Sequence, residues 1–389
     1  MITIFDYATV ITPTDIQERY AVIVSDEGRI QYVGPMEEAP RVDGLRLDMR
    51  GKFLVPGFIN IHVHGGNGIT FGNMDALGED LDAYSQWAAS NGVTGFLTSI
   101  TAATPRELTE MIAAYVPIME KGVPGAEALG IHLEGPFMNV EKKGAQNPEW
   151  IRDPDVAEAQ GYLDAGKGWI HQMTMAPELP NAKEVAALFR KAGVVNAVAH
   201  STANYDLARE AFLGDWTHVT HTFNAQTGLH HREPGLVGAL MSMDGITAEL
   251  IADNIHVHPG AMNVLIRAIG TDRVVLITDA MEAAGLPEGQ YALLGHDVIV
   301  KDGSARLVDG TLAGSAATMN QCVRHVHHDV GTSLPDAIKM ATLNPARAMG
   351  FSNRLGSIAI GKDASLTVID DDINVYLTMV KGNIVYNEL

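Results

Sequence analysis

The chain has 389 residues, of which 46% are hydrophobic and 19% charged, so it can bury a substantial core and exceeds the usual size of one compact domain. A formal net charge of −20, without a cluster of Lys and Arg, argues against nucleic acid or anionic membranes as partners. No apolar run reaches the roughly 20 residues of a membrane span, and no signal-like segment opens the chain. The single cysteine, Cys322, favours a cytoplasmic location.

The two ends of the chain are expected to form short strands. Apolar and polar residues alternate over 1–12, 20–34 and 45–57, and Asp-Glu-Gly at 26–28 is a turn signal. The tail alternates in the same way, with Gly and Asp between its apolar runs. We therefore predict one small β-sandwich domain assembled from residues 1–53 and 354–389. Two unrelated hairpins are the alternative.

The middle of the chain, residues 54–353, has a different pattern of apolar residues. Amphipathic helical stretches such as 75–92 and 104–122 alternate with short apolar runs at 95–101, 128–137, 173–178, 195–202, 218–225, 248–258 and 273–281. Seven or eight such units indicate an α/β fold of the (β/α)8 barrel type. A doubly wound sheet is the alternative, but its Gly-x-Gly-x-x-Gly fingerprint is absent. A barrel places functional residues at the C-terminal ends of its strands.

His62 and His64 follow an apolar run and precede Gly-Gly. In an extended strand, residues i and i+2 point to the same face, so both imidazoles can converge on one point. Imidazole is a common ligand of zinc and other first-row divalent ions. A pair of histidines on a strand is, however, also found on surfaces without any ion.

Four further polar residues end apolar runs: Glu134, His200, His221 and Asp279. A carboxylate that closes an apolar strand is costly unless it is paired or coordinated. Each residue alone could be a satisfied carboxylate or imidazole in the core. Together with the histidine pair, they predict a metal site at one end of the barrel.

A set of motifs identifies the family that the chain resembles. In chain order they are HVHGG, HLEGPF, AHSTA, HTFNA, REPGLVGA, ADNIHVHP, ITDAM, GTLAGS and MATLNPARAMG. Together they resemble the N-acetylglucosamine-6-phosphate deacetylases of the amidohydrolase superfamily. The resemblance implies a distorted barrel with a small β domain, a homodimer, and cleavage of acetate from the 2-acetamido group of a phosphorylated amino sugar.

The resemblance also implies roles for individual residues. Glu134, His200 and His221 match metal ligands present throughout the family, whereas His62 and His64 match a second site found in some members. One or two divalent ions are therefore expected per subunit, with zinc favoured and iron or another ion possible. Asp279 matches the general acid and base that serves a metal-activated water.

The remaining matches concern the substrate. The expected contacts to the sugar are Asn224 and Ala225, and those to its phosphate are Arg232 and His256. A local Arg and imidazole would hold an anion on an acidic protein. Gln146 stands where some one-metal members carry a histidine that polarises the acetyl carbonyl, so we hypothesise that the second metal takes over this task.

Two alternatives stay open at this point. The substrate could be the epimer N-acetylgalactosamine 6-phosphate, because the phosphate motifs do not separate epimers. The chain could also be a non-catalytic amidohydrolase-like binding protein, although such relatives typically lose metal ligands and this chain retains them.

Overall fold

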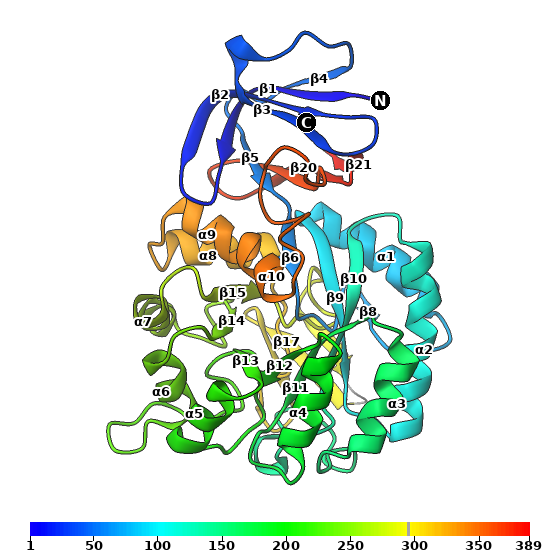
Figure 1. The fold of residues 1–389 in the computed structure, drawn as a ribbon, viewed down its shortest axis with the longest axis vertical. Coiled ribbons are helices and arrows are strands. Elements are labelled where there is room, and N and C mark those ends of the chain that lie inside the picture. The colour runs from blue at the N-terminus through cyan, green and yellow to red at the C-terminus, as the bar shows by residue number, and fades with distance from the viewer. Residues whose placement is uncertain (294–295) are drawn as a thin grey trace.

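A computed structural model describes residues 1–293 and 296–389. A β domain that contains both termini lies at one end of the molecule, and a larger body of strands and helices lies beneath it (Figure 1). Among the described residues, no helix combines the length and apolarity that crossing a membrane requires.

The β domain is one sheet of eight strands. Its order is β21-β20-β19-β5-β1-β2-β3, and β4 pairs with β1. The strands are β1 (Thr3–Ile11), β2 (Ile16–Val24), β3 (Ile30–Pro35), β4 (Leu45–Asp48), β5 (Phe53–Pro56), β19 (Leu366–Ile369), β20 (Val375–Val380) and β21 (Asn383–Asn387), and η1 (Met36–Glu38) lies between β3 and β4. Side chains from both ends of the chain, such as Phe5, Val22, Leu366 and Leu377, share one buried cluster.

The joining of the two ends in one β domain is therefore confirmed. Strand β5 pairs antiparallel with β19 and parallel with β1, so it lies between the opening strands and the tail. Because β5 ends at Pro56, the sheet extends past the predicted boundary at residue 53. The division into domains at residues 53 and 354 stays a prediction.

The larger body is built on a parallel sheet of eight strands, in the order β15-β14-β13-β12-β11-β10-β9-β6. These are β6 (Phe58–Asn60), β9 (Val93–Thr101), β10 (Glu127–Glu134), β11 (Ile170–Met175), β12 (Val195–Val198), β13 (Trp216–Val219), β14 (Thr247–Ile251) and β15 (Val274–Ile277). Each strand lies beside the next one in chain order, as the alternating strand and helix units predict. The α/β architecture of alternating strands and helices expected from the sequence is confirmed.

The sheet is distorted where its two end strands meet. No strand ladder joins β6 to β15, but the segments that follow them are hydrogen-bonded. The Asp279 amide donates to the His62 carbonyl at 3.0 Å, and the His64 amide donates to the Ala280 carbonyl at 2.9 Å. These bonds place the ends of the first and last barrel strands side by side, together with the functional residues that follow them.

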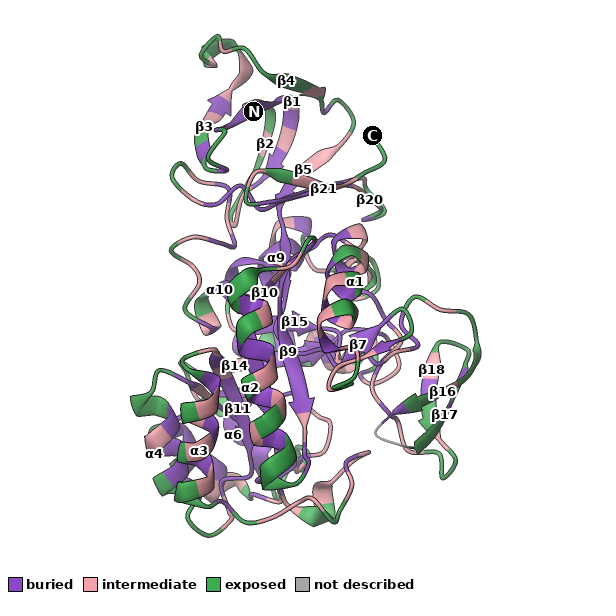
Figure 2. Cartoon of the chain, turned by 90° about the vertical axis from the view of Figure 1, so that its right-hand side faces the viewer, coloured by how far each residue is buried: buried purple, intermediate pink, exposed green. Residues whose placement is uncertain are grey.

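Helices cover the outside of this sheet (Figures 1 and 2). They are α1 (Leu77–Ser90), α2 (Pro105–Lys121), α3 (Val156–Gly166), α4 (Ala182–Lys191), α5 (Tyr205–Leu213), α6 (Gly235–Ser242), α7 (Pro259–Ile269), α8 (Met319–His328), α9 (Leu334–Ala341) and α10 (Leu343–Ala348). Helix α2 shows why the sequence folds in this way. Thr104 and Glu107 form a capping box and Pro105 opens the first turn, while Leu108 and Ile112 lie on the buried face.

A small antiparallel sheet follows β15 and is absent from the elements expected from the sequence. It contains β16 (Gly289–Leu293), β17 (His296–Lys301) and β18 (Ser304–Leu307), and it stands beside the barrel in Figure 2. A separate buried cluster that includes Met281, Val298 and Ala313 attaches it to the loop after β15. Two short strands, β7 (Gly65–Gly66) and β8 (Ile69–Thr70), and the 3-10 helix η2 (Val140–Lys142) complete the described elements.

Candidate metal centre and active site

The six residues predicted to serve metal and catalysis lie at one end of the barrel sheet. Glu134 is the last residue of β10, and the other five follow the C-terminal ends of β6, β12, β13 and β15: His62, His64, His200, His221 and Asp279. The carboxyl ends of parallel strands converge at one face of a barrel, which explains why residues far apart in the chain meet there.

The first group consists of Glu134, His200 and His221. Glu134 Oε1 lies 3.2 Å from His200 Nε2 and 3.0 Å from His221 Nε2, and the two Nε2 atoms lie 3.1 Å apart. All three side chains are buried. Their nitrogen and oxygen atoms therefore surround one point, as the ligands of a single ion would.

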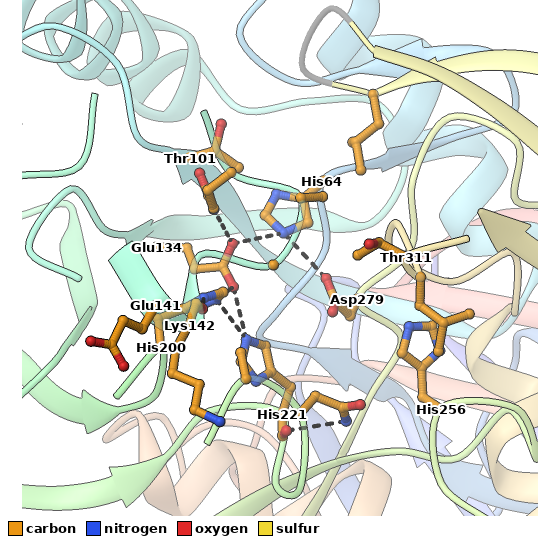
Figure 3. A pocket seen from close by; sticks show the side chains of 18 residues that line it. His64, Thr101, Glu134, Glu141, Lys142, His200, His221, His256, Asp279 and Thr311 are labelled. Carbon is orange, nitrogen blue, oxygen red and sulfur yellow. Dashed lines mark hydrogen bonds and ion pairs between the residues drawn. The ribbon is translucent and has the colours of Figure 1, made fainter. Parts of the chain in front are cut away.

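The second group consists of His62, His64 and Asp279. Its two Nε2 atoms lie 3.2 Å apart, and Asp279 Oδ1 lies 3.2 Å from His64 Nε2 and 3.5 Å from His62 Nε2. Glu134 reaches this group as well, because its Oε2 lies 3.4 Å from His64 Nε2. Figure 3 shows Glu134 between His64 and the pair formed by His200 and His221. Glu134 thus lies within reach of both groups.

These two groups fit divalent cations. In each group the Nε2 atoms of two imidazoles face each other beside a carboxylate. The lone pairs of these nitrogen and oxygen atoms would repel one another without a positive charge between them. Although burial lowers the pKa of His64, hydrogen bonds to the carboxylates of Asp279 and Glu134 outweigh it and raise that pKa to about 10. The donor set of imidazole and carboxylate suits zinc and other first-row ions.

The backbone at this centre adopts uncommon conformations. His200, His221 and Asp279 have φ values of 47°, 30° and 48°, in the left-handed region that L residues rarely occupy. Each lies two residues beyond the end of its strand. Strain of this kind persists where the surrounding structure fixes it, and it is concentrated at functional sites. Here it turns three strand ends so that their side chains point toward one another.

A cavity of about 350 Å³ opens onto the metal groups. Of the predicted site residues, the following line it: His64, Glu134, Gln146, His200, His221, Asn224, Ala225, His256 and Asp279. The size suits a small-molecule substrate. His62 lies behind His64 and is fully buried. The structure thus brings together the predicted catalytic, metal-binding and sugar-contacting residues, with Arg232 as the exception.

Arg232 lies outside this cavity in the single chain. It is exposed, and its Nη1 lies 2.7 Å from Nε2 of the neighbouring His231. The loop that carries it follows the cavity-lining residues Asn224 and Ala225 in the chain and ends at helix α6. Of the two predicted phosphate contacts, His256 therefore lines the cavity of its own subunit and Arg232 does not.

His256 is held in place by Asp253. Its Nδ1 lies 2.7 Å from Asp253 Oδ2, so Nε2 is the atom that can donate to a ligand. Burial lowers the pKa of His256, but the hydrogen bond and the charge of Asp253 outweigh it and raise that pKa above its ordinary value. The charged form of the imidazole is thereby favoured, and the side chain lies at the edge of the cavity (Figure 3).

Gln146 lines the cavity and also contacts Glu134. Its Nε2 donates to Glu134 Oε2 at 2.9 Å, and its Oε1 accepts from the Ala102 amide at 3.1 Å. The side chain amide is therefore oriented, with its donor end toward the shared carboxylate.

Sequence reasoning missed Glu249 and His218. Glu249 is fully buried on β14 and lies 2.9 Å from His62 Nδ1 through Oε2. His218 on β13 contacts the other oxygen of Glu249 at 3.2 Å. A signal was present, because Glu249 stands between the buried residues Ala248 and Leu250, and a carboxylate inside an apolar strand needs a partner.

Comparison with known proteins agrees with this geometry. The model of the amidohydrolase family matches residues 53–385. The chain belongs to the amidohydrolase family. Within it, the chain is 38% identical over 336 residues to an N-acetylglucosamine-6-phosphate deacetylase of Bacillus subtilis, covering 86% of this chain and 84% of that protein. The resemblance read from the motifs is thereby confirmed.

Two further relatives of this family show how far the likeness extends. An N-acetylgalactosamine-6-phosphate deacetylase of Escherichia coli O157:H7 is 36% identical, over 86% of this chain and 88% of that protein. A solved structure of a Mycobacterium smegmatis N-acetyl-D-glucosamine-6-phosphate deacetylase variant, in complex with N-acetyl-D-glucosamine-6-phosphate, has a TM-score of 0.91 and 34% identity. It covers 100% of this chain and 99% of that chain. Membership of the amidohydrolase family implies a divalent metal, and the two groups around Glu134 are where this chain can hold it.

Proposed function

We propose that this protein hydrolyses N-acetyl-D-glucosamine 6-phosphate to D-glucosamine 6-phosphate and acetate. The observation that carries the proposal is the joint lining of one cavity by Glu134, Asp279 and His256, which combines a metal ligand, a proton acceptor and a phosphate contact. A relative with this activity in its name is 38% identical over 86% of the chain. The test is acetate release from the phosphorylated sugar by the purified protein, before and after metal removal.

Asp279 is the residue that would move the proton. A bound divalent ion would lower the pKa of water and polarise the acetyl carbonyl. Asp279 lies 3.2 Å from His64 Nε2 at the edge of the cavity. Although burial raises the pKa of Asp279, His62 and His64 outweigh it and lower that pKa, so the carboxylate is ionised and able to accept a proton. It would then deliver the proton to the departing nitrogen.

We assign the metal ligands as Glu134, His200 and His221 for one ion and His62 and His64 for a second, with Glu134 shared. Zinc is the ion that we favour, and iron or another divalent ion fits the same donors. Gln146 would complete the site as a neutral donor, and the second ion would supply the polarisation that a charged histidine provides in one-metal relatives.

His256 should bind the phosphate as a cation. A group with a raised pKa is protonated below that pKa and loses its charge as the pH rises through it, so this contact weakens toward alkaline pH. Replacement of His256 with Gln should lower kcat/KM for the 6-phosphate by about 10–150-fold, the equivalent of about 1.5–3 kcal/mol for a charge-assisted bond.

The measurement is kcat/KM against pH above pH 7, where the phosphate, with a second pKa near 6, is already doubly charged. The unchanged protein should lose phosphate-dependent affinity with rising pH, and the His256→Gln protein should not. Identical pH profiles for the two proteins would contradict the assigned role.

Arg232 is proposed as a second phosphate contact, supplied across a homodimer. Its exposed position outside the cavity of its own subunit agrees with a contribution to the neighbouring one. Replacement of Arg232 with Met should lower kcat/KM for the 6-phosphate by about 10–150-fold, because a charge-assisted contact is worth about 1.5–3 kcal/mol. Activity on unphosphorylated N-acetylglucosamine should not change.

A subunit-mixing experiment tests whether Arg232 contacts the phosphate bound in its own subunit or in the neighbouring one. After subunit exchange, a dimer of Arg232→Met and Asp279→Asn chains contains one site with its own Asp279 and the arginine of the other chain. Partial recovery of activity on mixing is therefore expected. Equal losses on the phosphorylated and unphosphorylated sugars would instead show that Arg232 supports the fold.

The galactosamine epimer is the second candidate substrate, because the Escherichia coli relative that is 36% identical carries that name. The two sugars differ at one hydroxyl group, and Asn224 and Ala225 are the proposed sugar contacts. Acetate release measured on both 6-phosphates at equal concentration decides between them. We propose that the reaction takes place in the cytoplasm, in the use of amino sugars.

A further inference from the structure

We infer that Glu249, buried inside the barrel, is a positioning residue that orients ligands of both metal groups. It carries none of the roles assigned above, and it does not line the cavity. The inference rests on the proposed metal ligands, and its test is independent of the deacetylation reaction.

The two carboxylate oxygens of Glu249 contact different residues. Oε2 lies 2.9 Å from His62 Nδ1 and accepts from the His221 amide at 3.0 Å. Oε1 accepts from Gln172 Nε2 at 2.7 Å and lies 3.2 Å from His218 Nε2. One oxygen therefore contacts one residue from each metal group, while the other anchors the carboxylate to strands β11 and β13.

The contact with His62 sets which nitrogen can bind an ion. An ionised carboxylate only accepts hydrogen bonds, so His62 Nδ1 carries the hydrogen. The lone pair of His62 then resides on Nε2, the atom that lies 3.2 Å from His64 Nε2 within the metal group. A carboxylate behind a ligand imidazole also raises its basicity as a ligand.

The other ligand imidazoles lack such a partner. His200 Nδ1 lies 2.7 Å from the backbone carbonyl of Lys142, and within the described part of the chain Nδ1 of His64 and of His221 has no hydrogen-bond partner. Among these four, His62 is thus the imidazole with a carboxylate behind it. Glu249 reaches His221 instead through the backbone, where φ is 30° and a hydrogen bond helps to hold the strained turn.

The alternative is that Glu249 is a structural carboxylate whose partners merely satisfy it. Gln172 separates the two explanations, because it contacts Oε1 and neither metal group. Gln172→Met removes an anchor of the carboxylate, whereas Glu249→Gln changes the group that faces His62. Glu249→Asp provides a second variant that keeps the charge and withdraws it from His62 by one methylene.

The experiment titrates Zn²⁺ into chelator-stripped protein, in competition with a chromophoric chelator, and records the melting temperature of the metal-free protein. We expect Glu249→Gln and Glu249→Asp to weaken zinc binding most at the group that contains His62, by about 10–100-fold, the range seen when such outer contacts of ligands are lost. The loss at the other group should be smaller, because Glu249 reaches it only through the His221 amide. Gln172→Met should keep both zinc affinities within a factor of about 3 of the unchanged protein, even if its melting temperature falls.

Unchanged zinc affinity in both Glu249 variants, or an equal loss in Gln172→Met, would overturn the inference. A failure of the proposed function would look different, because zinc would then bind as expected in all four proteins while no acetate is released from the sugar phosphate.

Discussion

Replacement of Asp279 with Asn is expected to reduce kcat by about 10²–10⁴-fold, the range for loss of a general acid and base. Asn has the same shape as Asp but cannot take up a proton at neutral pH. Asp279 lines the cavity and lies at the edge of the second metal group, so it can reach both water and the departing nitrogen. The KM for the 6-phosphate should change little, because the proposed sugar and phosphate contacts are other residues.

Steady-state kinetics on N-acetylglucosamine 6-phosphate provide the measurement, and metal content must be determined on the same samples. Because Asp279 Oδ1 lies 3.2 Å from His64 Nε2, loss of an ion in the variant would give a fall in kcat for another reason. A rise in KM with nearly unchanged kcat would mean that Asp279 binds substrate and that another group is the base.

Replacement of Glu134 with Ala should remove both bound metal and activity. Its oxygens lie 3.0 Å from His221 Nε2 and 3.4 Å from His64 Nε2, so a single carboxylate faces both groups. Metal analysis of the purified variant should show both ions lost or bound at much lower affinity. Glu149→Ala is the matched control, because Glu149 is an exposed acid in the loop after β10 and should keep metal and activity.

The histidine pair provides a finer test of the same site. Changing His62 and His64 together to Ala should remove one ion and leave the ion held by Glu134, His200 and His221. Activity should fall strongly, because Gln146 is neutral and would be left to orient the carbonyl alone. Full activity of the double variant with one ion bound would contradict the two-metal assignment.

That the proposed metal ligands lie close together could be predicted from the sequence, because the barrel imposes a simple geometrical constraint. Every parallel strand ends at the same face, so an acid or imidazole at the end of each apolar run must meet the others. Glu134, His200 and His221 needed no knowledge of loop conformation to be placed together. The joining of both chain ends in one small β domain could be predicted for a different reason, because the alternation of apolar and polar residues at both ends indicated half-buried strands.

The features that were not predicted depend on contacts between distant residues, which no local sequence pattern indicates. Glu249 is recognisable as a buried acid, but its partner His62 lies 187 residues away, in the segment after β6, which the chain order does not place near β14. The antiparallel strands β16–β18 were missed because their alternation is short and interrupted by Gly and Asp. Arg232 was predicted as a phosphate contact, but its place outside the cavity of its own subunit was not, because the position of a loop relative to a cavity is not set by periodicity.

The most direct test of the account is acetate release from N-acetylglucosamine 6-phosphate by the protein as purified, after chelation, and after a divalent ion is returned. We expect the purified protein to release acetate rapidly, to lose this activity when the metal is removed, and to recover it when zinc or another divalent ion is added. Activity that persists in protein shown to be metal-free, or no release with both groups loaded, would contradict it.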